Sequence, residues 1–159
     1  MFNSMKTSSL VFLLLLLIIA DKISAMEIII YNKGISEKVT FTAEQEKKIQ
    51  DIVKDIYEKA DKTLSYSITK ENIKGIKSKD RCVEIIFDLS SMYSNGAIGT
   101  SVVRKMLIPI SGSYAGDIKN GNLTFFVGQD TEIDKYDGKS YGNSNGAKYI
   151  EQLYKALQR

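Results

Sequence analysis

The stretch from Thr42 to Leu64 constrains the fold most, because it has one apolar side that must be buried. Its apolar residues recur at three- and four-residue steps and form a single helical stripe: Ile49, Ile52, Val53, Ile56, Tyr57, Ala60 and Leu64. Thr42 with Gln45 three residues later matches a capping box, which is a helix start. The sequence therefore predicts a long amphipathic helix over residues 42–64.

A later strand offers a surface for this helix. Residues 82–89 alternate strictly, so that Val83, Ile85, Phe87 and Leu89 share one face of a strand. The opposite face, with Cys82, Glu84, Ile86 and Asp88, is expected to point outward. We predict that Ile49, Ile52, Val53, Ile56 and Ala60 pack against Val83, Ile85 and Phe87, with Ile150 and Leu153 closing the side.

The remaining segments suggest an antiparallel meander. Strand patterns occupy residues 27–31, 101–110 and 123–127, a short one follows the helix at 64–68, and a second apolar helical stripe covers 146–157. Pro109 must end its strand or lie at an edge, and Asn120-Gly121 is a hairpin signal. The lysine-rich segment 70–81 is interpreted as a solvated connection or an edge strand, and 90–100 and 128–145 as loops.

These patterns predict an α+β fold of two layers. An antiparallel meander sheet of four to five strands would carry the long amphipathic helix and the C-terminal helix on one face. Residues 26–159 are enough for one domain and too few for two. They hold one cysteine, Cys82, so no internal disulfide is possible, and we expect this thiol to be a buried or half-buried filler.

Residues 1–25 are interpreted as a signal peptide cleaved after Ala25. The apolar run of residues 10–20 is too short for a transmembrane helix and suits a signal-peptide core. An uncleaved membrane anchor and a cytosolic protein that starts at Met26 are the alternatives. The sequence therefore predicts a secreted or periplasmic protein that meets the membrane only through this segment if it stays uncleaved.

The composition excludes several chemistries. The chain contains no histidine, which removes Ser-His-Asp triads, Cys-His pairs and His-ligated zinc. We expect no cofactor. Four acids in residues 130–137, namely Asp130, Glu132, Asp134 and Asp137, could suit Ca²⁺. Lys135 and Tyr141 stand where an EF-hand needs Gly and Glu, so a solvated acidic loop is the preferred interpretation.

Two further patterns could serve catalysis. Ser67 and Lys70 fit the S-x-x-K pattern of serine enzymes, but Ser67 follows a predicted helix rather than opening one. Glu84 and Asp88 share a strand face at about 13 Å, which is wider than glycosidases use. A small exported hydrolase with carboxylate or Ser-Lys chemistry is therefore the alternative hypothesis for function.

The favoured hypothesis is an exported, non-enzymatic binding protein. Its partner would be an unknown macromolecule or small ligand in the envelope or outside the cell. Nucleic acid is not expected, because the lysine-rich segment 70–81 has no interleaved aromatic residues. The small net charge argues neither for nor against it. Residues in the two long loops are predicted to contact the ligand: Tyr93, Asn95, Tyr136 and Tyr141.

Overall fold

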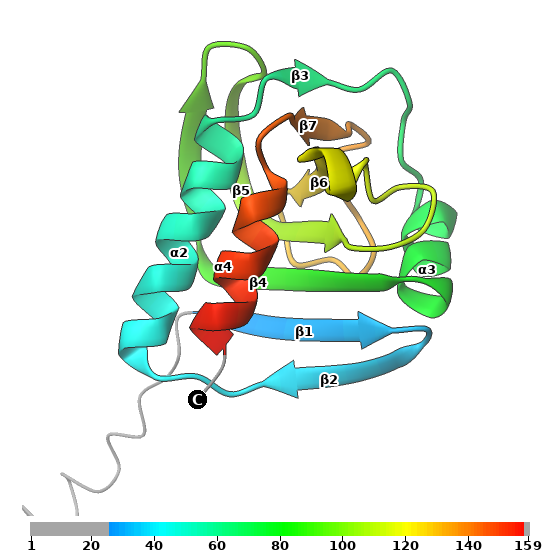
Figure 1. The fold of residues 1–159 in the computed structure, drawn as a ribbon. Helices are drawn as coiled ribbons and strands as arrows, with labels where there is room; N and C mark the ends of the chain where they lie inside the picture. Colours follow the sequence, from blue (N-terminus) through cyan, green and yellow to red (C-terminus); the bar gives the residue numbers. More distant parts are fainter. Residues whose placement is uncertain (1–25, 158–159) are drawn as a thin grey trace, which may run out of the picture.

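A computed structural model describes residues 26–157, so the signal-peptide prediction for residues 1–25 lies outside the described part of the chain. The fold is a seven-stranded antiparallel sheet in the order β2-β1-β4-β5-β6-β7-β3, with helices packed on it (Figure 1). The strands are β1 (Met26–Asn32), β2 (Ile35–Val39), β3 (Lys62–Thr63), β4 (Arg81–Asn95), β5 (Gly99–Pro109), β6 (Leu123–Gly128) and β7 (Tyr141–Asn143). The helices are α2 (Ala43–Glu58), α3 (Lys70–Lys79), the 3₁₀ turn η1 (Ile118–Asn120) and α4 (Ala147–Leu157).

The α+β class is confirmed, but the predicted count of four to five strands is wrong. The short strand predicted at 64–68 is wrong, because the strand in this region is β3, which lies just before it at Lys62–Thr63. The strands β2 and β7 were not predicted, and all three lie at or near the two edges of the sheet. β3 and β7 have two and three residues, too few to show an alternating pattern. β2 is exposed along most of its length and lacks an apolar face. Edge strands of this kind leave little signal in a sequence.

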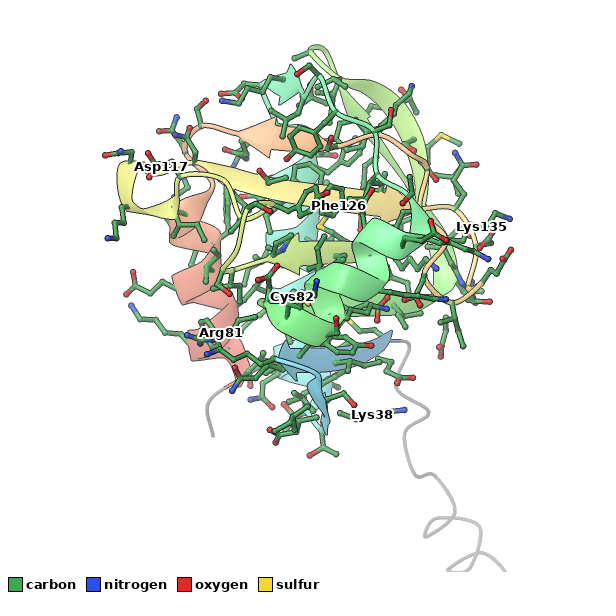
Figure 2. All side chains as sticks on the ribbon, turned by 90° about the vertical axis from the view of Figure 1, so that its right-hand side faces the viewer. Lys38, Arg81, Cys82, Asp117, Phe126 and Lys135 are labelled. Carbon is green, nitrogen blue, oxygen red and sulfur yellow. The ribbon has the colours of Figure 1, made fainter. Side chains whose placement is uncertain are left out.

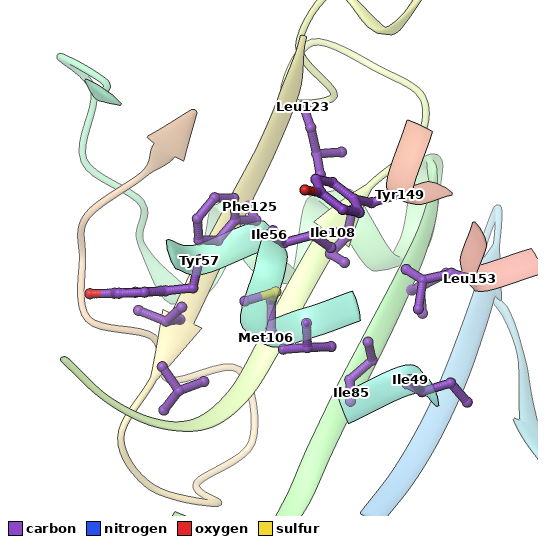
Figure 3. Close-up of a cluster of buried hydrophobic side chains, with 14 of the residues drawn as sticks. Ile49, Ile56, Tyr57, Ile85, Met106, Ile108, Leu123, Phe125, Tyr149 and Leu153 are labelled. Atoms are coloured by element: carbon purple, nitrogen blue, oxygen red, sulfur yellow. The ribbon is translucent and has the colours of Figure 1, made fainter. Parts of the chain in front are cut away.

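The predicted core is confirmed. α2 and α4 cover the same face of the sheet, and Ile49, Val53 and Ile56 of α2 are fully buried there (Figures 1 and 3). The cluster also contains the other expected side chains: Ala60, Val83, Ile85, Phe87, Ile150 and Leu153, with Ile52 partly buried against it. The capping box at Thr42 and Gln45 is present. The α2 helix ends at Glu58, however, six residues before the predicted end.

Most of the segment 70–81 is the helix α3, which ends at Lys79, not a solvated connection or an edge strand. Thr69 and Asn72 form a capping box at the start of α3, and Ile73 and Ile76 are its buried residues. The lysines around this two-residue stripe concealed its helical period. α3 packs on the side of β4 that was expected to face outward, so that Cys82 and Glu84 are buried (Figure 2). The sheet is therefore covered on both faces, and the two-layer description is incomplete.

The predicted loop 90–100 is mostly strand. β4 continues to Asn95 and pairs with β5 from Gly99, so only the three residues 96–98 form the turn. A register shift between Ile86 and Ser91 interrupts the alternation of β4 and hides its continuation. Pro109 is the last residue of β5, as predicted. Asn120-Gly121 closes η1, where Gly121 has φ +89°, rather than forming a two-residue hairpin turn.

Candidate functional site

A buried group of charged and phenolic side chains lies on the α3 face of the sheet. Lys77 of α3 donates from Nζ to Glu84 Oε1 at 2.9 Å and to Asp134 Oδ1 at 2.8 Å. Glu84 also accepts the hydroxyls of Tyr31 at 2.8 Å and of Tyr136 at 2.7 Å. Glu84 is only 3% exposed, so its carboxylate is satisfied entirely by protein donors. We call these five residues the ionic cluster.

The surroundings shift the pKa values of Tyr31, Tyr136 and Lys77 in the ionic cluster. Burial and the adjacent Glu84 carboxylate raise the pKa of Tyr31 to about 12, and the same causes raise the pKa of Tyr136 well above its ordinary value. Burial opposes the charge of Lys77, but hydrogen bonds to Asp134 and Glu84 outweigh it and raise its pKa to about 12. At neutral pH Lys77 is therefore an ammonium, and Tyr31 and Tyr136 are neutral phenols.

A second buried lysine lies beside the ionic cluster. Lys105 of β5 is 1% exposed, and its ammonium donates to the backbone carbonyl of Glu132. The same Nζ lies 4.8 Å from the centroid of the Tyr136 ring, within cation–π range. Burial lowers the pKa of Lys105, although Glu84 and nearby acids act in the opposite direction. The alternating pattern of residues 101–110 shows which residues share a strand face with Lys105, but it does not show that this lysine is buried.

These contacts hold the segment 129–138 against the sheet. Asp134 adopts a left-handed conformation with φ +58°, which a short polar residue tolerates, and its carboxylate reaches Lys77. Tyr136 reaches Glu84, and the Asp137 amide donates to the Val127 carbonyl at 2.9 Å. The segment is therefore a loop with fixed attachment points. Lys135 lies at the outer edge of this loop, beyond the N-terminal end of α3 (Figure 2).

The attached loop encloses a surface hollow of about 470 Å³. Its lining exposes polar and apolar surface in about equal amounts and consists of Gln129, Asp130, Lys135, Tyr136, Asp137 and Gly138. Lys135 forms ion pairs with Asp130 at 2.9 Å and with Glu132 at 3.0 Å. Asp137 is half-buried and, within residues 26–157, has no lysine or arginine nitrogen within 4.0 Å. Within the described residues, the hollow therefore contains a carboxyl group that takes part in no ion pair, although Lys135 also lines it and Lys139 lies near enough to lower the pKa of Asp137.

The carboxyl group of Asp137 is held by hydrogen bonds rather than by an ion pair. Its Oδ2 accepts long hydrogen bonds from Gln129 Nε2 at 3.3 Å and Ser101 Oγ at 3.5 Å. Burial raises the pKa of this carboxyl, while those hydrogen bonds lower it in part. A cation placed in the hollow would offset the free-energy cost of burying the Asp137 carboxylate.

The structure separates the four residues predicted to bind a ligand. Tyr93 and Tyr141 are buried in the core, where both rings lie about 6 Å from the ring of Tyr57, at centroid distances of 5.8 and 6.1 Å. The amide nitrogen of Asn95 lies within hydrogen-bond distance of the carbonyls of residues 57, 58 and 60, at the end of α2. These three side chains support the fold in this structure. Tyr136 alone lines the hollow, and ligand binding by it stays a prediction.

The other candidate sites do not assemble in the described residues. Lys70 pairs with Glu132 at 2.5 Å, and no hydrogen bond joins it to the exposed Ser67. Glu84 is buried whereas Asp88 is exposed. No group of three His, Cys, Asp or Glu side chains in residues 26–157 could hold a metal ion. No helix among them is long and apolar enough to cross a membrane.

Neither the ionic cluster nor the hollow was predicted as a unit. The acids of residues 130–137 were a signal for the loop, but their partners Lys77 and Lys105 lie far away in the chain. Comparison of the chain with protein-family models, with curated proteins and with solved structures finds no match. The chemistry of the site is therefore the basis for any functional conclusion.

Proposed function

We propose that residues 26–159 form an exported binding protein whose ligand occupies the hollow of the 129–138 loop. The observation that carries this proposal is Asp137, a half-buried carboxylate without an ion-pair partner in the described chain, in a hollow of about 470 Å³. Binding sites are commonly concave, with a few fixed polar groups. Export rests on the sequence of residues 1–25, which suits a signal peptide.

The ionic cluster gives this loop the rigidity that a binding site needs. Lys77 and Glu84 belong to regular elements, and they hold Asp134 and Tyr136 on either side of Lys135. A loop attached in this way loses little conformational entropy when a ligand binds. The cluster itself is a poor candidate for catalysis, because Lys77, Glu84 and Asp134 are paired with one another and none of these three lines the hollow.

The charge of the hollow indicates the ligand class. Among the described residues, Asp137 faces the hollow without an ion-pair partner, whereas Lys135 is already shared between Asp130 and Glu132. A small ligand or an exposed side chain with a protonated amine or guanidinium group would form a charge-assisted hydrogen bond to Asp137. The alternative hypothesis of a hydrolase has no geometry of this kind in its favour.

The proposal is tested with residues 26–159 and two cationic probes, spermidine and N-acetyl-arginine amide. Titrations followed by amide NMR should show saturable shifts at residues 129–138, and a neutral disaccharide should cause none there. Asp137→Asn should weaken probe binding at least tenfold. Glu37→Gln is the matched control, because it removes one exposed negative charge on β2. Unsaturable shifts, or equal binding by both variants, would overturn the proposal.

A further inference from the structure

Three members of the ionic cluster are arranged as a covalent link between two side chains requires. Lys77 Nζ lies 2.8 Å from Asp134 Oδ1 and 2.9 Å from Glu84 Oε1, so one amine contacts two carboxyl groups at once. None of the three side chains is more than 11% exposed. Because they are buried and none of them lines the hollow, the groups that they can reach are those of the chain itself.

We propose that Lys77 Nζ condenses with the Asp134 carboxyl group to form an amide bond between the two side chains, and that Glu84 carries the protons. The bond would join α3 to the 129–138 loop, between two residues that lie 57 positions apart. The ion pair described above is the state from which the reaction starts, and a freshly folded chain holds it. The reaction is independent of what the hollow binds.

The contacts of the two carboxyl groups assign their roles. Glu84 accepts the hydroxyls of Tyr31 and Tyr136 as well as Lys77, so three donors hold its oxygens on the strand β4. The Asp134 carboxylate makes its hydrogen bond to Lys77 from a loop, so its carbon can approach Nζ without disturbing a strand. Asp134 is therefore the acyl group, and Glu84 is the fixed proton acceptor.

The cluster supplies the contact and the dryness that an amine and an acid lack in water. A carboxyl carbon lies one bond beyond its oxygen, so Nζ is already close to the roughly 3–3.5 Å from Asp134 Cγ that a near-attack geometry needs. Exclusion of water favours condensation over hydrolysis. Burial opposes the charge of Lys77, and transfer of one proton to Asp134 turns the buried ion pair into an uncharged amine and acid.

The reaction balances without an oxidant or a reductant. After the proton transfer, the Nζ lone pair attacks Asp134 Cγ and the C–N bond forms. Glu84 takes one proton from the nitrogen and passes it to an Asp134 hydroxyl. The C–O bond then breaks, and its electron pair leaves with the oxygen as water. The products are one neutral amide and one water molecule, and Glu84 is a carboxylate again.

Such a bond would act on the fold as a disulfide does. Cys82 is the only cysteine of the chain, so no internal disulfide is possible. A covalent link between residues far apart in the chain restricts the unfolded state and so stabilises the folded one. Here the link would also fix the loop that forms the hollow.

A second ion pair between α3 and the same loop provides an internal control. Lys70 contacts Glu132, but their side chains are 47% and 49% exposed. Water reaches this pair, and Lys70 contacts no second carboxyl group in the described residues that could carry the protons. We therefore expect no amide between Lys70 and Glu132.

Mass spectrometry of intact residues 26–159 tests the bond. A folded chain kept for a week at neutral pH and physiological temperature should become lighter by one water molecule, whereas a chain kept in urea should not. Peptide mapping should then find Lys77 joined to Asp134. Lys77→Met has no amine and should keep its full mass. Lys70→Met is the matched control, and it should lose water as the wild type does.

Glu84→Gln separates the proton carrier from the two groups that it serves. It keeps the amine and the acid and should slow the loss of water at least tenfold. Circular dichroism checks that the variants fold. A succinimide at Asp137-Gly138 would also release one water, but it would persist in Lys77→Met. A folded wild-type chain that keeps its full mass would overturn the proposal, as would a mapped link between other residues or an equal loss of water by Lys77→Met or Glu84→Gln.

Discussion

The two faces of the sheet are stabilised in opposite ways. Under α2 and α4, the core is apolar and contains side chains such as Ile56 and Ile85, both with no exposed surface. Under α3 and the 129–138 loop, a small apolar cluster lies beside Lys77, Glu84 and Lys105. Burial on the first face is non-directional, whereas the ionic cluster works only when each donor meets its acceptor. The first face supplies stability, and the second sets where a loop lies.

The largest effect is expected from Lys77→Met. This change leaves Glu84 and Asp134 as buried carboxylates without their cation. The free energy of unfolding should fall by about 3–5 kcal/mol, the usual cost of breaking a buried ion pair. Urea denaturation of residues 26–159 measures it.

A triple variant tests whether the loss of stability in Lys77→Met comes from the uncompensated charges. Lys77→Met combined with Glu84→Gln and Asp134→Asn removes the uncompensated charges and should recover at least half of the lost stability. If the triple variant is less stable than Lys77→Met alone, the charges themselves are net stabilising and the comparison of the two faces is wrong in that respect.

On the apolar face, Ile56→Ala should lower the free energy of unfolding by about 2–5 kcal/mol. Ile56 is fully buried between α2 and the sheet, so the deleted methyl groups leave a cavity that the close-packed core cannot fill (Figure 3). The same urea titration applies. A cost under 1 kcal/mol would show that this face repacks freely.

The ionic cluster also predicts a loss of stability at alkaline pH. The pKa values of Lys77 and Tyr31 are raised to about 12 in the folded chain, from 10.5 and 10.0. The stability they contribute is present below pH 10 and is lost as pH rises to 12. Lys105 acts in the opposite direction, because burial lowers its pKa. The free energy of unfolding should fall from pH 10 to 12, and the fall should be smaller in Tyr31→Phe. A rise over this range would contradict the prediction.

The smallest effect is expected on the outer surface of α2. Lys54 is exposed and its Nζ lies 4.0 Å from Glu58, which is a weak helical ion pair. Lys54→Ala should change the free energy of unfolding by a few tenths of a kcal/mol at most. A change comparable to that of Ile56→Ala would mean that α2 is turned differently on the sheet.

The sequence by itself determined the apolar half of the fold and several exclusions. The stripe of α2, the alternation of Val83, Ile85 and Phe87, and the capping box at Thr42 were all readable, because each depends on neighbours within one or two turns or strand steps. The lack of histidine excluded His-based catalysis without any structure. The burial of Cys82, which raises its pKa to about 12, also agrees with the filler role that was expected.

Only the tertiary structure decided which polar faces of the strands and loops are covered by other parts of the chain. Glu84 has a polar pattern but is buried, because α3 and Tyr136 cover it. Tyr93 lies in a segment that resembles a loop, yet it packs against Tyr57. Local periodicity shows which face of an element is apolar, but it carries no information on contacts such as Lys77 to Asp134, which are 57 residues apart. The chain must fold before those charges can meet, so the ionic cluster and the hollow beside it are properties of the tertiary structure.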